Sequence, residues 1–325
     1  MSVTAIIPNW NARALLEPLL ASIASQTRRF DDVLMVDNGS TDGSPEAAER
    51  GGARVLRLDR NYGFAYAVNR GIEVASTRLV ALINNDVELH RAWLETLVEA
   101  MTSTAAWFAS GKVLCAAQPG LIDGAFDLLA TSGCAWRAGS GRPDAPVWNE
   151  GRKLGLAPMT AALFHRELFD RVGNLDENFG SYLEDVDFGL RCGSKGYSGI
   201  YVPAAVAYHR GSATLGRWSP RKVRQIARNQ VLLVAKHYAP RLRRECGWAI
   251  ALGQCLWGLV ALRHGHPGAW LAGKLEGLRD CRRYEEAPDG AVRNLIRESE
   301  RELLDLQRRC GFDLYWRVYF ALKQA

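Results

Sequence analysis

The first hundred residues alternate between short apolar runs and stretches in which apolar residues recur at helical spacing. The short runs are rich in β-branched residues and predict strands at 3–8, 33–36, 53–58 and 79–83. The intervening stretches predict helices at 12–26, 44–51, 64–75 and 91–101. Alternating strands and helices are typical of βαβ units, so the chain is predicted to be α/β, with a mostly parallel sheet and helices on both faces.

Beyond this region the pattern becomes less regular and then turns helical. Residues 115–157 are richer in Gly and Pro and show weak periodicity, which predicts an irregular insertion or a lip over the site. Regular periodicity returns at 159–172, and a further strand is predicted at 199–208.

The chain changes class near residue 219, and this change defines the predicted domain boundary. An α/β domain is expected at 1–218, with halves at about 1–115 and 116–218. An all-helical extension is expected at 219–325.

The composition is that of a soluble globular protein, with 48% apolar and 23% charged residues in a length of 325. The formal net charge is +6, and much of the basic excess lies in 217–244 and 274–283. No nucleic-acid-binding motif accompanies these segments, so no nucleic-acid partner is expected. Attraction to an anionic membrane surface or to phosphorylated substrates fits the charge better.

The seven cysteines are scattered and form no Cys-x-x-Cys pair. Such a set argues against a disulfide framework and a structural zinc site, and for a reducing compartment. The first residues resemble a strand rather than a signal peptide, because a basic n-region and a long apolar segment are absent. Export is therefore not expected, and a cytoplasmic location is predicted.

Polar strings follow two of the predicted strands. Asp37 opens the first string, and Asp86 closes the second, Asn84-Asn85-Asp86. In open α/β sheets, ligands bind beyond the carboxyl ends of the strands. The Asp37 carboxylate can accept hydrogen bonds from a nucleobase, and Asp86 can hold Mg²⁺ or Mn²⁺ through oxygen. Each string is also compatible with an ordinary turn rich in Asn, Asp and Gly.

Three carboxylates, Glu184, Asp185 and Asp187, lie within four positions beside aromatic and apolar residues. A carboxylate with apolar neighbours can serve as a general base, because burial raises its pKa and fixes its orientation. The alternative is an acidic first turn of a helix, which the helix dipole favours.

Two further segments carry candidate ligand-binding groups. His209 follows the strand predicted near the end of the first domain, where an imidazole can bind a metal, and Arg210 can pair with phosphate oxygens. Asn61 and Gly63 precede a predicted helix that contains Asn69, and backbone N–H groups at a helix start can face a ligand. Ordinary helix capping is the alternative for this second segment.

Six strings, taken in order, resemble the family 2 inverting glycosyltransferases, in particular their bacterial rhamnosyltransferase-like members. The strings are Thr4-Ala5-Ile6-Ile7-Pro8-Asn9-Trp10, Val36-Asp37-Asn38-Gly39-Ser40-Thr41-Asp42-Gly43-Ser44, Asn61-Tyr62-Gly63-Phe64-Ala65, Leu82-Ile83-Asn84-Asn85-Asp86-Val87-Glu88-Leu89, Glu184-Asp185-Val186-Asp187-Phe188 and His209-Arg210-Gly211-Ser212. The resemblance covers roughly residues 3–215. It implies a GT-A fold and a nucleotide-sugar donor.

The resemblance also implies roles for individual residues. Asp185 matches the catalytic base, and Glu184 orients the acceptor or the base. Asp86 matches the metal-binding aspartate of the DxD motif, and His209 matches a later histidine on the metal side. Asn84 replaces the first aspartate of that motif, which removes one charged ligand. The residues implied to bind the nucleotide-sugar are Pro8, Asn9, Asp37, Asn61, Gly63, Asn69, Asn85 and Arg210.

The implied activity is inverting transfer of a sugar, with Mg²⁺ or Mn²⁺ as cofactor. The expected donor is dTDP-rhamnose or a UDP-sugar, and the expected acceptor is a glycan or polyprenyl-diphosphate-linked acceptor of cell-surface polysaccharide synthesis. A catalytically inactive sugar-nucleotide-binding or scaffold protein of the same fold is the alternative. A dinucleotide-dependent oxidoreductase is disfavoured, because residues 8–12 lack the Gly-x-Gly-x-x-Gly motif after the first strand.

The helical extension contains an apolar stretch with basic flanks at 246–262. This stretch is compatible with a core helix, an interfacial membrane helix or a membrane span. Residues 269–283 predict a helix with a basic end, and 289–307 predict a charged helix that can pack on the domain or form a homodimer. The aromatic end at 312–320 fits an interfacial anchor or a helix docked on the core. A lipid-linked acceptor would fit a peripheral location on the inner face of the cell membrane.

Overall fold

The computed structural model describes residues 1–156, 158–211, 218–285, 290 and 292–323. These residues form two compact units. The first contains residues 1–126 and the described residues from 139 to 211. The second contains Asp127–Ala138 and the described residues from 218 onward.

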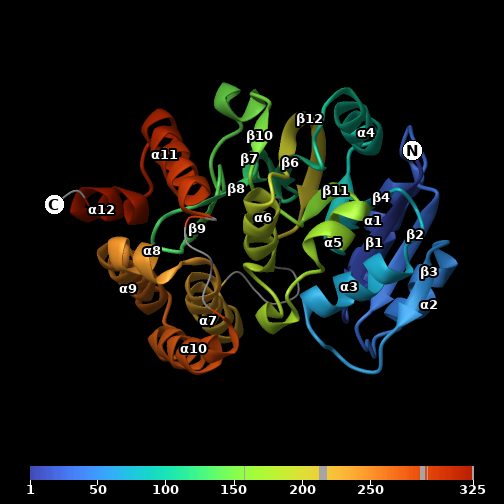
Figure 1. The fold of residues 1–325 in the computed structure, drawn as a ribbon. Coiled ribbons are helices and arrows are strands. Elements are labelled where there is room, and N and C mark those ends of the chain that lie inside the picture. The colour runs from blue at the N-terminus through green and yellow to red at the C-terminus, as the bar shows by residue number, and fades with distance from the viewer. Residues whose placement is uncertain (157, 212–217, 286–289, 291, 324–325) are drawn as a thin grey trace. The chain divides into compact units, whose positions relative to one another are not determined.

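The first unit is built around a mixed β-sheet (Figure 1). Its strand order is β10-β12-β6-β11-β4-β1-β2-β3, with β5 paired to β12 and β7 paired to β6. The strands are β1 (Val3–Asn9), β2 (Asp32–Asp37), β3 (Arg54–Arg57), β4 (Leu79–Ile83), β5 (Val87–Leu89), β6 (Phe108–Cys115), β7 (Gln118–Gly124), β10 (Arg152–Leu154), β11 (Ala161–His165) and β12 (Gly199–His209). The part β3-β2-β1-β4 is parallel, as predicted, whereas β11 runs antiparallel to β4 and β6.

Helices cover both faces of this sheet. They are α1 (Arg13–Ala24), α2 (Ser44–Arg50), α3 (Phe64–Val74), α4 (Trp93–Ser103), α5 (Glu167–Val172) and α6 (Glu184–Ser194), with short 3₁₀ turns at Pro146–Asn149 and Glu177–Phe179. Successive strand residues point to opposite faces, so Ala5 and Ile7 of β1 join the core under α1 and α4. Ile6 faces α3, where a Cβ at Gly71 would lie 2.4 Å from Ile6 Cγ2. Glycine therefore allows α3 to pack directly on the sheet.

The segment 115–157, predicted to be irregular, contains short strands. Besides β7 and β10, it holds β8 (Asp127–Leu129) and β9 (Ala135–Arg137). These strands have three to seven residues each. Segments of this length show too few alternations for a periodic pattern to be recognised.

The second unit combines the β8–β9 hairpin with helices. These are α7 (Pro220–His237), α8 (Pro240–Glu245), α9 (Gly247–Arg263), α10 (Pro267–Asp280), α11 (Arg293–Cys310) and α12 (Leu314–Lys323), with a 3₁₀ turn at Cys281–Arg283. Glu300 Oε1 of α11 accepts hydrogen bonds from Thr131 Oγ1 and from Tyr319 OH, both at 2.8 Å. These buried bonds explain why residues 127–138, assigned from the sequence to the α/β domain, cluster with the C-terminal helices.

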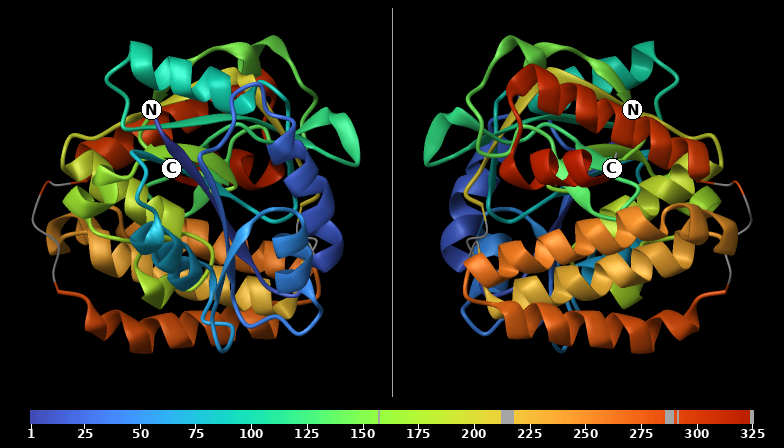
Figure 2. Two further views of the ribbon diagram at one scale, coloured as in Figure 1. Left: turned by 90° about the vertical axis from the view of Figure 1, so that its right-hand side faces the viewer. Right: turned by 90° about the vertical axis from the view of Figure 1, so that its left-hand side faces the viewer.

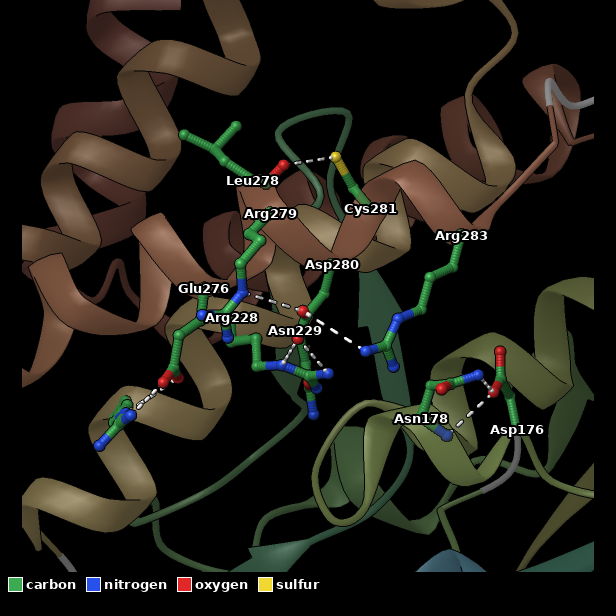
Figure 3. A network of polar contacts seen from close by, with 11 residues as sticks. Asp176, Asn178, Arg228, Asn229, Glu276, Leu278, Arg279, Asp280, Cys281 and Arg283 are labelled. Carbon is green, nitrogen blue, oxygen red and sulfur yellow. Dashed lines mark hydrogen bonds and ion pairs between the residues drawn. The ribbon is translucent and has the colours of Figure 1, made fainter.

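Helices α7, α9 and α10 lie side by side (Figure 2). Arg228 of α7 donates from Nη2 to Asp280 Oδ2 of α10 at 2.8 Å (Figure 3). One turn away, Arg224 pairs with Glu276. A Cβ at Gly273 would lie 2.1 Å from the carbonyl oxygen of Arg224, so α10 approaches α7 more closely than any larger residue would permit.

Helix α9 corresponds to the apolar stretch predicted at 246–262. In the part of the chain that the structure describes, no helix combines the length and the apolar content required to cross a bilayer. The aromatic end packs within its own unit, because Trp316, Tyr319 and Phe320 of α12 are buried. Of the two alternatives for this segment, the docked helix is therefore the one observed.

Candidate active site

The ends of β1, β2 and β4 form one polar edge of the sheet. Asn9 ends β1 next to Pro8, and its register partner in β2 is Asp37. Asn38 N donates to Asn9 O at 2.8 Å. Asn85, in the turn after β4, donates from Nδ2 to Asn9 Oδ1 at 2.9 Å. Because parallel strands end at the same edge, residues that are distant in sequence meet here.

Asp37 presents an unsatisfied acceptor at this edge. Only 3% of the residue is exposed. Its Oδ2 accepts a hydrogen bond from Ser40 N at 3.0 Å, whereas Oδ1 has no hydrogen-bond partner among the described residues. A buried acceptor without a donor costs on the order of 1–3 kcal/mol. An N–H group of a bound ligand would satisfy this oxygen.

Asn38, which the sequence interpretation did not single out, ties the polar edge to the turn before α3. Its Nδ2 donates to Asn61 Oδ1 at 3.1 Å and to Gly63 O at 3.0 Å, and its Oδ1 accepts from Tyr62 N at 2.9 Å. These partners lie 23 to 25 residues away, so no local signal distinguishes Asn38 from other turn asparagines. The Asn61 amide oxygen is thereby engaged within the protein.

The start of α3 contacts the loop that precedes α6. Ala65 N donates to Gly180 O at 2.9 Å, and Phe64 N donates to Ser181 Oγ at 3.4 Å. A Cβ at Gly63 would lie 3.3 Å from Gly180 Cα, and the φ of Gly63 is +96°. The N–H groups of Phe64 and Ala65 therefore hold the loop at 180–181 in place. Contact of Asn61 and Gly63 with the donor stays a prediction.

Asn69 supports the same region from the interior. Its Nδ2 donates to Leu175 O and Glu177 Oε1, and its Oδ1 accepts from Leu175 N, all at 2.9 Å. The residue is buried. This geometry gives Asn69 a bracing role, and direct contact between its side chain and the donor stays a prediction.

The three carboxylates of α6 have different surroundings. Asp187 is fully buried, and its Oδ2 accepts from Arg191 Nε at 3.0 Å. Glu184 is buried at the first position of the helix. Asp185 is partly exposed, and its Oδ1 accepts from Val186 N at 2.8 Å. Asp187 is therefore paired within the fold, and Asp185 is the most exposed of the three carboxylates. The catalytic roles of Asp185 and Glu184 stay predictions.

The turn before these carboxylates is strained. Tyr182 and Leu183 adopt φ angles of 69° and 68°. The left-handed region costs non-glycine residues about 1–2 kcal/mol each. Such strain persists only where the surrounding structure enforces it, and it clusters at functional sites. It determines where α6 begins, and hence where Glu184 and Asp185 stand.

A second group of polar residues surrounds His209. Strand β5 pairs with the end of β12 and brings His209 Nε2 to 3.0 Å from Asp86 Oδ1. His209 Nδ1 lies 2.9 Å from Asp123 Oδ2 on β7. Burial by itself would lower the pKa of His209, but the hydrogen bonds with Asp123 and Asp86 outweigh it and raise this pKa to about 9. The sequence patterns did not indicate Asp123, because only the pairing of β7 with β6 brings this residue next to His209.

Asp86 offers a carboxylate oxygen to a divalent cation, and His209 offers Nε2 once an arriving cation displaces the proton that the raised pKa keeps on this nitrogen. Within the described ranges, no group of three or more His, Cys, Asp or Glu side chains could hold a metal ion by itself. Mg²⁺ is typically held by one or two carboxylates, with substrate phosphates and water completing its shell. The pair therefore fits a cation that binds together with a diphosphate.

Arg210 adds positive charge beside His209. Its Nη2 pairs with Glu88 at 2.9 Å, and its backbone N donates to Asp86 O at 3.0 Å. A pocket of about 500 Å³ adjoins this pair, lined by Glu88, Ala116, Ala117, Tyr208 and Arg210.

Two family models match the chain. The model described as Glycosyl transferase family 2 matches residues 4–121. The model described as Glycosyl transferase family group 2 matches residues 79–264, which is more than half of the chain. A relative named N-acetylglucosaminyl-diphospho-decaprenol L-rhamnosyltransferase, from Mycobacterium tuberculosis (strain CDC 1551 / Oshkosh), is 29% identical over 280 residues. The match covers 76% of this chain and 87% of the relative.

Solved structures share the fold. GalNAc-T7 with UDP, GalNAc and Mn²⁺ superimposes with a TM-score of 0.65 at 14% identity, and the match covers 94% of this chain and 58% of that one. The mannosyltransferase PcManGT from Pyrobaculum calidifontis, in complex with GDP-Man and Mn²⁺, gives a TM-score of 0.52 at 19% identity, covering 99% and 86%. The predicted fold class, a GT-A sheet followed by C-terminal helices, is confirmed.

Proposed function

The chain belongs to the family 2 glycosyltransferases, and we propose that it moves a sugar, with inversion, from a nucleoside-diphosphate donor to a hydroxyl group of a lipid-linked glycan. The observation that carries this proposal is the row of contacts from Asp37 through Asn9 and Asn85 to the Asp86–His209 pair. At one end of the row, Asp37 Oδ1 can accept a hydrogen bond from the nucleobase of the donor. At the other end, Asp86 and His209 can bind a cation that contacts the diphosphate of the donor.

The nucleotide lies along this row. Asp37 Oδ1 accepts a hydrogen bond from an N–H of the base, which satisfies the buried oxygen. Pro8, Asn9 and Asn85 follow in the direction of the diphosphate, and Arg210 adds positive charge at that end.

Asp86 Oδ1 and His209 Nε2 would hold Mg²⁺ or Mn²⁺, whose charge stabilises the departing diphosphate. Asp123 holds the opposite ring nitrogen of His209 and keeps Nε2 directed at Asp86. Asn84 supplies no charge, so retention of the cation depends strongly on the diphosphate of the donor.

Asp185 removes the proton from the acceptor hydroxyl as the hydroxyl oxygen bonds to the anomeric carbon. The bond from that carbon to the diphosphate breaks, and its electron pair leaves with the diphosphate. Attack opposite the leaving group inverts the configuration, and no covalent intermediate with the enzyme forms. Glu184 orients the acceptor or the base.

The mycobacterial relative is named as an L-rhamnosyltransferase of N-acetylglucosaminyl-diphospho-decaprenol. By this similarity, the donor of the present enzyme is dTDP-rhamnose, and its acceptor is a polyprenyl-diphosphate-linked sugar of cell-surface polysaccharide synthesis. Such an acceptor resides in a bilayer, so the enzyme works at the inner face of the cell membrane.

A transfer assay tests this function. The purified chain is incubated with Mn²⁺ or Mg²⁺, an N-acetylglucosaminyl diphosphate on a short, water-soluble prenyl chain, and either dTDP-rhamnose or a UDP-sugar. We expect mass spectrometry to detect the added deoxyhexose with dTDP-rhamnose, and EDTA to abolish the product. Thermal shifts identify which donor binds, since a ligand stabilises the folded state by mass action. Donor binding without transfer or hydrolysis would favour the inactive sugar-nucleotide-binding alternative.

A further inference from the structure

Helix α9 exposes three of its large apolar side chains, Trp248, Leu259 and Leu262. Its buried positions include the small residues Ala249, Gly253 and Ala261, as well as Leu252. Its exposed positions are Gly247, Trp248, Ala251, Cys255, Leu259, Leu262 and Arg263. The structure describes every residue of α9. Among the exposed positions of this helix, only Arg263, at its C-terminal end, is charged. A helix on a water-facing surface normally shows the opposite arrangement.

Helix α10 has the same inverted arrangement. Gly273 and Gly277 face α7, where Cβ atoms would lie 2.1 Å from Arg224 O and 2.7 Å from Val231 Cβ. The exposed side carries leucines at helical spacing, at Leu271, Leu275 and Leu278. Glycines four residues apart at a helix contact, with leucines on the other side, are typical of helices that meet lipid.

The two helices form an antiparallel hairpin. Gly258 of α9 lies against Trp270 of α10, and Lys274 Nζ donates to Gln254 Oε1 at 2.7 Å. We define the hairpin rows as Trp248, Leu259, Leu262, Leu271, Leu275 and Leu278. Each of these residues has between 52% and 62% of its surface exposed. So much exposed apolar surface on adjacent helices marks an interaction surface.

Basic residues stand at both ends of the hairpin. Arg263 lies at the turn between the helices, and Arg279, Arg282 and Arg283 lie at the opposite end, all of them exposed. Neither helix, each described over its full length, has an Asp or Glu at an exposed position. The hairpin therefore combines apolar rows with positive charge that an anionic surface would complement.

We propose that the α9–α10 hairpin docks on the surface of an anionic lipid bilayer. The hairpin rows enter the boundary between head groups and acyl chains, and the arginines lie among the lipid phosphates. A second copy of the chain is a poorer occupant, because a twofold contact would bring arginines together without a facing acid. The docking itself is argued from the hairpin alone. Its role, which is to hold the enzyme where the lipid-linked acceptor lies, rests on the proposed function.

Vesicle flotation of the full chain tests the docking surface. Vesicles of phosphatidylcholine with and without phosphatidylglycerol are compared at low and high salt. Wild type should float with the anionic vesicles, and high salt should weaken the association. Leu271→Gln/Leu275→Gln/Leu278→Gln should lower the partition coefficient at least about tenfold, because apolar transfer is lost while Gln preserves helix propensity.

Matched variants separate the hairpin rows from exposed apolar surface in general. Leu275→Gln should weaken binding, whereas Leu314→Gln, at a comparably exposed leucine of α12, should leave it unchanged. Arg279→Gln/Arg282→Gln should remove most of the dependence on phosphatidylglycerol. Thermal melts should stay close to wild type for every variant, because the substituted side chains are exposed and Asp280, which pairs with Arg279, keeps Arg228 as a partner.

Three outcomes would overturn the proposal: wild type that ignores anionic vesicles, a triple variant that binds them as wild type does, or a lipid-free dimer that the triple variant dissociates. Transfer to the short-chain acceptor separates this inference from the proposed function. The triple variant should keep wild-type transfer to that acceptor and lose transfer to an acceptor embedded in vesicles. Wild type that floats but transfers no sugar would instead contradict the function and leave the docking surface standing.

Discussion

Asp123 and His209 are 86 residues apart in sequence, yet Asp123 Oδ2 lies 2.9 Å from His209 Nδ1. The contact uses the ring nitrogen opposite to the one that faces Asp86. Partners of this kind fix the orientation of a metal-binding imidazole and raise its basicity. Asp123 is therefore a positioning residue for the cation site, although it touches neither the cation nor the donor in the proposed arrangement.

Asp123→Asn should weaken Mn²⁺ binding about tenfold in the presence of a nucleoside diphosphate, because a neutral partner orients the imidazole less firmly. Titration of free Mn²⁺ by electron paramagnetic resonance measures this without turnover. Asp305→Asn, at an exposed position of α11, is the matched control and should bind as wild type does. If the Asp123 variant and wild type bind Mn²⁺ with equal affinity, Asp123 has no role in positioning His209 for the cation.

Asp185→Asn should leave donor affinity nearly unchanged and remove most turnover, at least about a hundredfold, because the base no longer accepts a proton. Isothermal titration with the donor and a steady-state transfer assay measure the two quantities separately. Transfer at the wild-type rate would show that another group is the base.

Asp187→Asn should lower the stability of the fold and leave transfer activity nearly unchanged. Asp187 is fully buried against Arg191, so the neutral variant leaves the guanidinium without its counter-charge. Loss of a partner from a buried ion pair costs about 3–5 kcal/mol, and the amide, which still accepts a hydrogen bond, should place this variant near the lower value. Urea unfolding measures the loss of stability. Transfer activity assayed well below the midpoint of unfolding should stay close to wild type, and a selective loss of kcat would assign Asp187 to catalysis.

The parallel part of the sheet was predictable because its strands are short, β-branched and separated by helical patterns. Strand β4, for example, is buried at every position and contains no polar residue to obscure the pattern. The ends of such strands are known from the sequence alone, so Asp37 and Asp86 could be placed at one edge. Asp123 could not be found in the same way, since β7 pairs with β6 through register shifts that no local pattern encodes.

The C-terminal helices show a different limit of sequence patterns. Leucines at helical spacing in α10 suggest a buried face, but Gly273 and Gly277 bring the opposite side of the helix against α7. Which face of α10 is buried depends on which face lets the backbones of α10 and α7 approach more closely. Hydrophobic periodicity carries no information about this approach. The partner of α10 is α7, more than 30 residues earlier, so the choice is made by tertiary packing.

Gly273→Ala should destabilise the fold by about 1–3 kcal/mol, because the added methyl group would lie 2.1 Å from Arg224 O and would force α10 away from α7. Gly268→Ala in the same helix is the control. Its Cβ would meet nothing within 4 Å, so the substitution should be neutral or stabilise by up to about 1 kcal/mol. Chemical denaturation of both variants provides the comparison. Equal stability of the two would mean that the helices separate at no cost.

Lys274 makes the stability of the second unit depend on pH. Burial lowers the pKa of this lysine from 10.5 to about 8, and the thiols of Cys134 and Cys255 act in the opposite direction. Its ammonium group donates to Gln230 Oε1 at 2.8 Å and to Gln254 Oε1 at 2.7 Å, neither of which carries a compensating charge. Between pH 8 and 10.5 the unfolded chain therefore binds more protons at this residue than the folded chain does.

Stability attributable to Lys274 should thus rise as pH increases through this window and be constant below it. Relative to Lys274→Met, wild type should gain about 1.5 kcal/mol between pH 8 and pH 9.5. Urea unfolding of both proteins under reducing conditions measures the difference, and taking that difference cancels the titration of other groups, including the buried Cys134. The two glutamines lose their donor in the variant, but this penalty is independent of pH. Parallel stability curves for the two proteins would mean that Lys274 stays protonated across the window, and hence that its head group is hydrated in the folded protein.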